Sequence, residues 1–339
     1  MKAYVVKARA KLGNLPNLMD YKNLIDEQDF SRKFDKVKEL HPSLRKIKDL
    51  DQVETELELE MSHTIKSLSY FLKDYEKDFF DRYTSAYEIR LIQNVIQGIM
   101  NESLNDSIYL FKNNSFSKNL VIKKDMKFED FVGSLKNTRY HRTLVPFLNK
   151  NMSKDSMIFL ISNSLTKFYF IDLLDYSSKF PKNLAKKIRI FIGKEIDLYN
   201  IEMLYRLISY FDLPAYQIFN YLIEGGDKLK ADKLKKLSNM TIDKFKDEIK
   251  DTPYGHIFSD FFDFNKALME ERYKIYKDLS KEDNILFLIY AVNMLDMTDK
   301  NIISILHMDN SFTRDEQESL IVTGWCNGSW KNEACKHHG

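Results

Sequence analysis

A five-residue apolar pattern occurs three times in this chain of 339 residues, and it constrains the fold more than any other feature. Successive members are separated by 3, 4, 5 and 4 residues. The first three positions share one helical stripe, and the step of five indicates a break before the last two. Each copy therefore predicts a helix, a short turn and a second short helix. The copies are Leu18, Tyr21, Ile25, Phe30 and Phe34; Phe128, Phe131, Leu135, Tyr140 and Leu144; and Ile242, Phe245, Ile249, Tyr254 and Phe258.

A second element follows the repeated pattern at an offset of 84 residues. Both of its copies predict a helix, a short turn and a helix, and the segment 87–99 is the plausible equivalent in the first part of the chain. Because the two elements repeat at offsets of 114 and 84, the middle unit must hold an insertion, and 156–178 predicts one added helix. The matched positions are Ile201, Leu204, Phe211, Asp212, Leu213, Ile218 and Leu222 with Ile285, Leu288, Leu295, Asp296, Met297, Ile302 and Leu306.

These repeats predict an all-α fold built of three similar helical domains that pack on one another. The expected boundaries are 1–115, 116–230 and 231–320, with 321–339 as a tail. Segment 50–72 alternates like a strand in "ELELEM", but its apolar residues keep helical spacing over six turns, and this length favours a helix. Ten glycines and six prolines also indicate few turns.

The charges exclude some classes of partner. Fifty-two basic and 50 acidic residues are mixed along the chain, which argues against nucleic acid as the main partner.

The longest apolar run, 285–295, is shorter than the roughly 18 residues of a membrane span, and the N-terminal segment lacks the apolar stretch of a secretory signal. Cys326 and Cys335 are the two cysteines, so we expect no disulfide framework. The sequence therefore predicts a soluble, cytoplasmic protein.

The glycine pair in "YFDLPAYQIFNYLIEGG" (210–226) raises the question of a phosphate-binding loop. No strand precedes it, and Glu224 and Asp227 flank the glycines with the wrong charge for phosphate. Pro214 suits the first turn of a helix, and Gly225 suits its left-handed C-terminal cap. We therefore expect a plain helix over about 214–224.

Several segments, taken in order, resemble the family of the central-stalk connector of rotary ATPases. This connector is the C subunit of archaeal and bacterial A/V-type enzymes and the d subunit of eukaryotic V-ATPases. The resemblance covers roughly residues 3–310 and rests on the order of the segments, not on a catalytic motif. The segments are "YVVKARAKLGNL", "YEIRLIQNVIQGI", "FEDFVGSLKNTRYHRTL", "EIDLYNIEMLYRLISYFDLPAYQIFNYLIEGGDKL" and "KLKKLSNMTIDKFKDEIKDTPY".

The resemblance implies a mechanical part and not an enzyme. The family fold is a funnel of three helical domains around a pseudo-threefold axis. One face receives the central rotor shaft and the other seats on the membrane-embedded proteolipid ring, so torque passes between them during proton or sodium transport. The implied partners are thus the rotor-shaft subunits and the ring, with no cofactor or metal, and the place in the cell is cytoplasmic and peripheral to the membrane.

Glu202, Arg206 and Tyr210 form a polar stripe opposite an apolar one on the expected helix. Their two readings are a surface ion pair with a neighbouring tyrosine and a stripe that meets the rotor shaft. The lysine-rich segment 228–236 is similarly either a solvated face or a surface for lipid headgroups or an acidic partner.

The alternative is an all-helical, magnesium-dependent enzyme that acts on a diphosphate. Three Asp-apolar-apolar-Asp strings, at 78–81, 172–175 and 260–263, motivate it, because aspartates three apart share a helix face. The plainer expectation is that the aspartates face water while the apolar pairs face the core. The tail residues Cys326, Cys335, His337 and His338 match no common zinc spacing, so we expect a frayed tail, with metal binding as the alternative.

Overall fold

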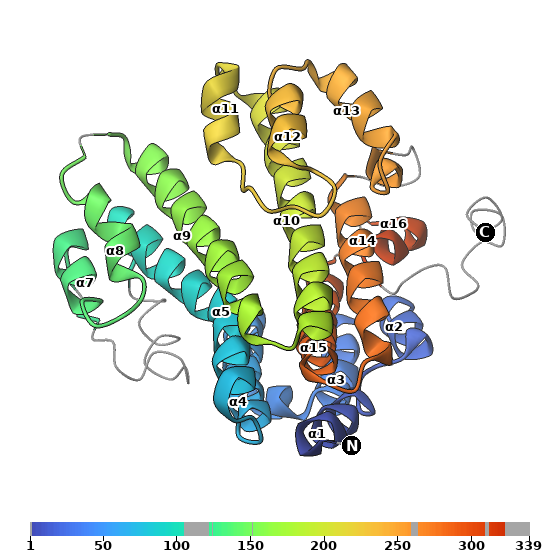
Figure 1. Ribbon diagram of the computed structural model, residues 1–339. Helices are drawn as coiled ribbons and strands as arrows, with labels where there is room; N and C mark the ends of the chain where they lie inside the picture. The colour runs from blue at the N-terminus through green and yellow to red at the C-terminus, as the bar shows by residue number, and fades with distance from the viewer. Residues whose placement is uncertain are drawn as a thin grey trace. The chain divides into compact units, whose positions relative to one another are not determined.

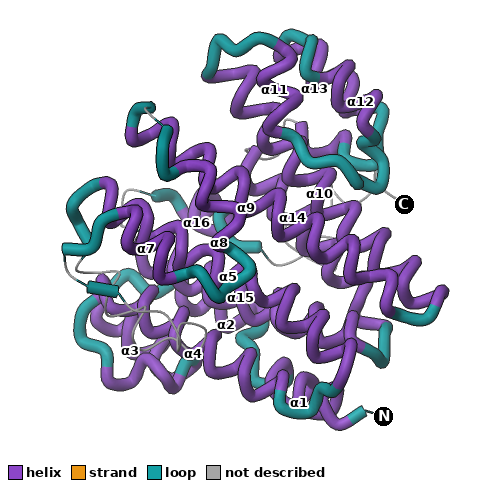
Figure 2. The backbone as a smooth tube through the Cα atoms, turned by 60° about the vertical axis from the view of Figure 1, so that its left-hand side comes forward, coloured by secondary structure: helices purple, strands orange, loops and turns teal. Residues whose placement is uncertain are grey.

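The computed structural model describes residues 2–104, 122–123, 125–150, 152–258, 264–308 and 312–322. Throughout this part of the chain the regular structure is helical and contains no strand, which confirms the all-α prediction (Figure 2). Contacts divide the chain into two compact units: the terminal unit, Met1–Leu57 with Gly193–Gly339, and the central unit, Glu58–Ile192. Helices α4 (Val53–Ser69) and α10 (Lys182–Tyr210) run across the division.

Two antiparallel helices, α5 (Asp74–Met100) and α9 (Lys154–Tyr176), form the body of the central unit (Figure 1). The Tyr169 hydroxyl donates to the Tyr83 carbonyl oxygen at 3.0 Å, and an Arg82–Asp172 ion pair lies nearer the start of α5. Helices α7 (Phe128–Ser134) and α8 (His141–Leu144) pack against this pair. The buried core includes Ile92, Phe131, Val132, Leu135, Leu144 and Leu165.

The terminal unit joins the two ends of the sequence. Helices α2 (Leu18–Ile25) and α3 (Phe30–Leu40) share a buried core with α15 (Ile285–His307), while α1 (Ala3–Leu12) packs on α15 and α16 (Arg314–Ser319) on α2. That core contains Tyr21, Leu24, Val37, Leu44, Ile302, Ile305 and Leu306. Burial of apolar surface from segments nearly 300 residues apart therefore closes this part of the fold.

The remaining helices of the terminal unit surround the C-terminal part of α10. They are α11 (Ala215–Tyr221), α12 (Ala231–Leu237), α13 (Ile242–Lys250) and α14 (Phe264–Asp278). Arg272 of α14 pairs with Glu202 of α10 at 3.2 Å, and Tyr276 donates to Glu195 at 3.2 Å, so the two helices lie side by side. Figure 1 shows α11, α12 and α13 grouped at the end of α10 where it finishes at Tyr210.

The threefold pattern is confirmed at the level of local structure. Its copies form α2 followed by α3, α7 followed by α8, and α13 followed by the 3₁₀ turn Gly255–Phe258. In each copy, the hydroxyl of one tyrosine also forms a hydrogen bond with a residue of a long helix. Tyr140 donates to Glu88 of α5, Tyr254 donates to Asp197 of α10, and Tyr21 hydrogen-bonds to Asn301 of α15.

The helix expected over 50–72 is confirmed as α4, with Leu50 in a preceding 3₁₀ turn, Leu50–Gln52. Its stripe Val53, Leu57, Met61, Ile65 and Leu68 is buried, as helical spacing requires, and Leu72 is buried in the turn beyond the helix, which ends at Ser69. The inserted helix expected at 156–178 is α9.

Two local predictions are wrong. Helix α15 runs through 295–297 without the expected turn, because no residue there interrupts its buried face. Asn200 and Asn301 make the same pair of backbone hydrogen bonds, which relates α10 to α15 at an offset of 101 instead of 84. Helix α11 ends at Tyr221, so Gly225, with φ 106°, serves the loop beyond and not a helix cap.

Helix α9 departs from the expectation drawn from apolar runs. The helical segment Lys154–Lys179 is long and apolar enough, by length and composition, to cross a membrane. A single such helix is weak evidence, since core helices of soluble proteins pass the same test, and α9 packs along α5. The three-domain boundaries and the pseudo-threefold arrangement stay predictions; the boundary near 115 lies outside the described residues.

Candidate partner-binding site

The predicted stripe lies on the last three turns of α10, where the helix carries its apolar face inward. Ile201 and Leu204 are fully buried, whereas Arg206 and Tyr210 are exposed. Glu202 forms an ion pair with Arg206, one helical turn away, at 2.9 Å. The structure therefore brings Glu202 and Arg206 together, and Tyr210 follows them on the same face.

Glu202 has a second partner that the sequence does not reveal. Arg272 of α14 approaches its other carboxylate oxygen at 3.2 Å. Burial alone would lower the pKa of Arg272, but its interactions with Glu195, Tyr276 and Glu202 raise it overall. Glu202 is thus held between a half-buried and an exposed arginine, which restricts its rotamer and leaves Arg206 as the outward-facing charge.

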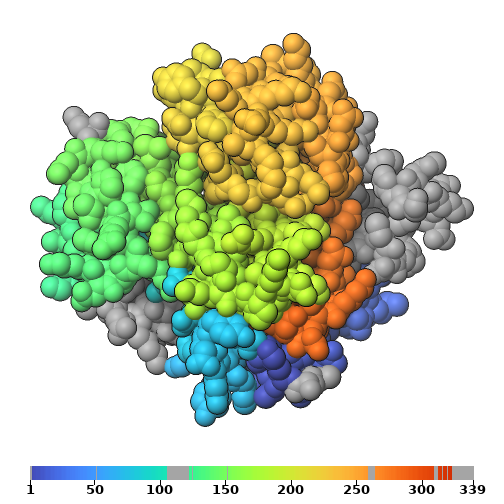
Figure 3. Space-filling model, viewed as in Figure 1, coloured from blue at the N-terminus to red at the C-terminus, as the bar shows by residue number. Residues whose placement is uncertain are grey.

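Aromatic side chains extend the stripe around the end of α10. Tyr205 stacks on Phe264 at 4.1 Å and meets Tyr210 edge-on at 6.4 Å. Tyr210, Phe211 and Tyr216 are 71%, 57% and 66% exposed. Figure 3 shows α11, yellow, at the surface beside the gold atoms of the segment that follows it.

Phe211 and Tyr216 are functional candidates that the sequence analysis missed. Their signal was present in "YFDLPAY", where apolar residues follow the helix end without helical spacing. Pro214 stands at the start of α11, so the turn holds these aromatic rings outside the core. Exposed aromatic residues beside an arginine are the composition of protein-binding hot spots.

A buried carboxylate anchors the loop that follows α11. Asp197 of α10 is fully buried and accepts the amide protons of Lys228 and Leu229 at 2.6 and 3.0 Å, together with the Tyr254 hydroxyl at 2.9 Å. Burial raises the pKa of Asp197, and these three hydrogen bonds act in the opposite direction. Three donors on one carboxylate connect α10, the loop and the end of α13.

Asn200 makes a second attachment three residues further along α10. Its amide nitrogen donates to the Ile223 carbonyl at 2.7 Å, and its amide oxygen accepts the Ile223 N–H at 2.8 Å. A Cβ at Gly226 would overlap the Asp197 carboxylate and come within 2.9 Å of the Leu229 carbonyl oxygen. The loop can therefore approach α10 this closely because residue 226 is glycine.

The aspartate strings of the alternative hypothesis are engaged by basic and hydroxyl groups. Tyr176 donates to Asp78 at 3.0 Å, Asp81 pairs with Lys77, and Asp172 pairs with Arg82 and, at 3.2 Å, with Arg139. Phe79 and Phe80 are fully buried, as the plainer expectation requires. Within the described ranges no cluster of three His, Cys, Asp or Glu side chains suits a metal, and the string at 260–263 lies outside those ranges.

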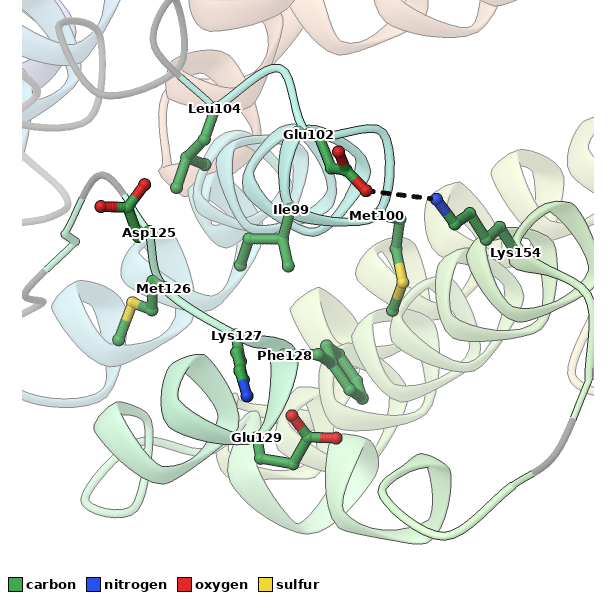
Figure 4. Close-up of a pocket in the computed structure, with 11 residues that line it drawn as sticks. Ile99, Met100, Glu102, Leu104, Asp125, Met126, Lys127, Phe128, Glu129 and Lys154 are labelled. Carbon is green, nitrogen blue, oxygen red and sulfur yellow. Dashed lines mark ion pairs between the residues drawn. The ribbon is translucent and has the colours of Figure 1, made fainter.

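A hollow of about 520 Å³ opens in the central unit near the end of α5 (Figure 4). Glu102 points toward Lys154 across its rim, and the two side chains pair at 3.9 Å. Asp125, Lys127 and Glu129 add further charges of both signs. Because the lining charges oppose one another, the hollow selects neither an anion nor a cation.

Two other candidate segments have different outcomes. The tail with Cys326, Cys335, His337 and His338 lies outside the described residues. In the basic segment 228–236 most lysines have acceptors: Lys228 pairs with Asp227, Lys230 donates to the Gly226 carbonyl, and Lys233 and Lys236 pair with Glu248.

Comparison with known proteins agrees with this architecture. The family model of the ATP synthase (C/AC39) subunit matches residues 5–305. The C subunit of the A-type ATP synthase of Methanococcoides burtonii is 27% identical over 176 residues, which are 51% of this chain and 47% of the relative. The protein of the same name from Methanosphaera stadtmanae is 22% identical over 268 residues, or 75% and 66%.

A third relative, the corresponding A-type ATP synthase protein of Methanosarcina mazei, is 27% identical over 182 residues, which are 52% of this chain and 48% of the relative. The chain thus spans about half the length of the first curated relatives that it matches. The family match, in contrast, extends over nearly all of the described helices. The chain therefore belongs to the ATP synthase (C/AC39) subunit family.

Proposed function

We propose that this protein is a non-catalytic connector in an A/V-type rotary ATPase. In this role it links the central rotor shaft to the membrane-embedded proteolipid ring and transmits torque for ATP-coupled proton or sodium transport. The observation that carries the proposal is the family match over residues 5–305, which includes all three repeats. The shared name of the relatives, the C subunit of A-type ATP synthases, supports the same assignment.

A connector must resist shear, and the hydrogen bonds between helices suit that requirement. The Asp197 carboxylate and the Asn200 amide attach the 222–229 loop to α10 through buried bonds. Arg272 further ties α14 to α10. Because water does not reach buried bonds of this kind, it cannot replace them when the surface is loaded, and the interior deforms little.

The end of α10 is our candidate for the shaft-binding surface. It comprises the predicted Glu202, Arg206 and Tyr210, with Phe211 and Tyr216 added from the structure. Glu202 orients Arg206 by their 2.9 Å pair, and the three exposed aromatic rings supply apolar area that water otherwise covers. A helical shaft with acidic and apolar residues would match this surface.

The place in the cell and the domain arrangement follow from the same proposal. The connector would be cytoplasmic and peripheral to the membrane, held there through the complex, with its three helical domains forming a funnel around a pseudo-threefold axis. No observation favours the diphosphate enzyme over this function, because Asp78, Asp81 and Asp172 are already bonded to other side chains.

Affinity capture from gently solubilised host membranes, followed by mass spectrometry, tests the connector role. Recovery of the rotor-shaft subunits and the proteolipid ring in comparable amounts is the expected result. Arg206→Ala with Tyr210→Ala should reduce recovery of the shaft subunits, whereas Lys244→Ala, an exposed change on α13, should not. Recovery of the chain alone would contradict the proposal.

A further inference from the structure

The α4–α5 turn of the central unit exposes a group of aromatic rings. Tyr70 is 82% exposed, and Phe71 and Tyr75 are each 41% exposed. Tyr70 meets Phe71 edge-on at 5.3 Å, and Tyr75 meets Phe180 edge-on at 5.0 Å. The second contact places the turn beside the segment that joins α9 to α10. We call residues 70–75 and 178–187 together the lysine–aromatic corner.

Basic residues dominate the exposed charges of this corner. It contains five lysines against a single acidic residue, Asp74, which gives a net charge of +4. All five lysine side chains are exposed: Lys73, Lys179, Lys182, Lys186 and Lys187. The exposed aromatic rings therefore lie on the same two segments as these exposed lysines.

Four acidic residues flank the corner, namely Glu76, Asp78 and Asp81 on α5 and Asp175 on α9. On the next turns of α5, Asp78 accepts the Tyr176 hydroxyl and Asp81 pairs with Lys77. The ion pairs found among the described residues include none with Lys73, Lys179, Lys182 or Lys186. These four lysine charges are thus available to an external anion.

The contrast with the basic segment 228–236 is informative. That segment looked more basic in the sequence, but Lys228, Lys233 and Lys236 pair with carboxylates, and Lys230 donates to a carbonyl oxygen. In the folded chain most lysines of segment 228–236 therefore have an acceptor. At the lysine–aromatic corner, in contrast, the four available lysines come from two segments that lie more than 100 residues apart in the sequence.

We propose that the lysine–aromatic corner binds the surface of an anionic lipid bilayer. Clustered lysines beside a membrane surface each add attraction to anionic headgroups. Tyrosine rings, with an apolar body and a polar hydroxyl, occupy the boundary between headgroups and acyl chains. The proposal goes beyond membership of the ATPase, because the free chain would bind lipid without its partner subunits.

The side-chain chemistry favours lipid over an acidic protein as the occupant. Lysine is depleted from the cores of protein interfaces, where arginine is enriched. The arginine nearest the corner in sequence, Arg189, donates instead to the Ser177 hydroxyl at 2.9 Å. Long, mobile lysines suit a fluid array of phosphates, which offers no fixed geometry for bidentate pairing.

Co-sedimentation of the purified full chain with lipid vesicles tests the proposal. We expect binding to vesicles that contain phosphatidylglycerol, weak binding to pure phosphatidylcholine vesicles, and loss of binding as salt concentration rises. The triple variant Lys179→Ala, Lys182→Ala and Lys186→Ala should weaken binding to the anionic vesicles by about tenfold or more. Tyr70→Ser should weaken it further without changing its salt dependence.

A charge-matched variant provides the control. Lys235→Ala, Lys244→Ala and Lys281→Ala remove three exposed lysines from the terminal unit and should leave vesicle binding unchanged. Equal losses of vesicle binding in the two triple variants would show that binding depends on the net charge of the protein alone. That result would overturn the proposal. Absence of binding to protein-free anionic vesicles would also overturn it, and corner-dependent capture of a protein would then identify a protein occupant. Vesicle binding and recovery of the rotor complex are measured separately, so either result on lipid binding leaves the proposed function to its own test.

Discussion

The Tyr254 hydroxyl donates a hydrogen bond to the Asp197 carboxylate at 2.9 Å across 57 residues of sequence. Tyr140 makes the corresponding bond to Glu88 in the central unit. Both tyrosines occupy the fourth position of the repeated pattern, where the first copy has the exposed Phe30, so the second and third copies attach to a long helix through a buried phenol. In these two copies the pattern thus includes a tertiary hydrogen bond as well as a helical turn.

Tyr254→Phe should lower the free energy of unfolding by about 1.5–3 kcal/mol, because a buried carboxylate loses one of its three donors. Urea unfolding followed by circular dichroism measures the change. Tyr216→Phe, at an exposed tyrosine on α11, is the matched control and should change stability by less than about 0.5 kcal/mol. Equal effects of the two variants would contradict the assigned role of Tyr254.

Asp197→Asn should change how stability depends on pH. Burial raises the pKa of Asp197 above its ordinary 3.8, so the folded state binds this proton more tightly than the unfolded state. Its favourable contribution is complete below 3.8 and is lost as pH rises through the raised pKa.

The asparagine variant cannot ionise and should lack this component. The difference in unfolding free energy, wild type minus variant, should therefore fall between about pH 4 and pH 7. Urea titrations at several pH values measure it. A difference that stays constant or rises with pH would show that the three hydrogen bonds outweigh burial.

Gly226→Ala should destabilise the protein by about 2 kcal/mol or more, because the new methyl group overlaps the Asp197 carboxylate. Gly133→Ala is the matched change, since a Cβ there meets nothing within 4 Å. In helix α7 it should be neutral or stabilising by up to about 1 kcal/mol. Thermal unfolding of the two variants compares them directly, and equal losses would refute the proposed close approach.

Two arginines that share Glu202 should behave differently. Arg272→Ala should cost about 2 kcal/mol, because it leaves Glu195 and Glu202 without the half-buried cation beside them. Arg206→Ala, at an exposed i,i+4 pair, should cost less than about 1 kcal/mol yet weaken binding of the shaft subunits. Unfolding curves and affinity capture separate the two effects. A large stability loss in Arg206→Ala would assign the residue to the fold instead of the interface.

The helices could be predicted because their signals are local. Helical spacing sustained over the length of the segment identified α4 where the sequence also alternates like a strand, and the difference between the two repeat offsets located α9 as an inserted helix. The same signal failed at 295–297, where the matched residues at 211–213 lie at a helix end but α15 continues. The predicted break at 295–297 is absent because continuous burial holds α15 together, and spacing cannot reveal the neighbours that supply that burial.

The candidate site was only partly visible in the sequence. The 2.9 Å pair between Glu202 and Arg206 follows from their helical spacing. Arg272 lies 70 residues away, and Phe211 was matched only as an apolar position of the second repeated element, so neither could be connected to the stripe before the chain was folded. The lysine–aromatic corner was likewise invisible, since its two turns are distant in sequence.

By itself, the sequence determined the helical class, the threefold local pattern and the family, because these depend on residue spacing and on the order of segments. Only the tertiary structure decided which charges remain available. Four of the five lysines at 228–236 have partners such as Glu248, while Lys179, Lys182 and Lys186 form no ion pair among the described residues. The physical reason is that an ion pair depends on distance in space, and the packing of distant segments sets that distance.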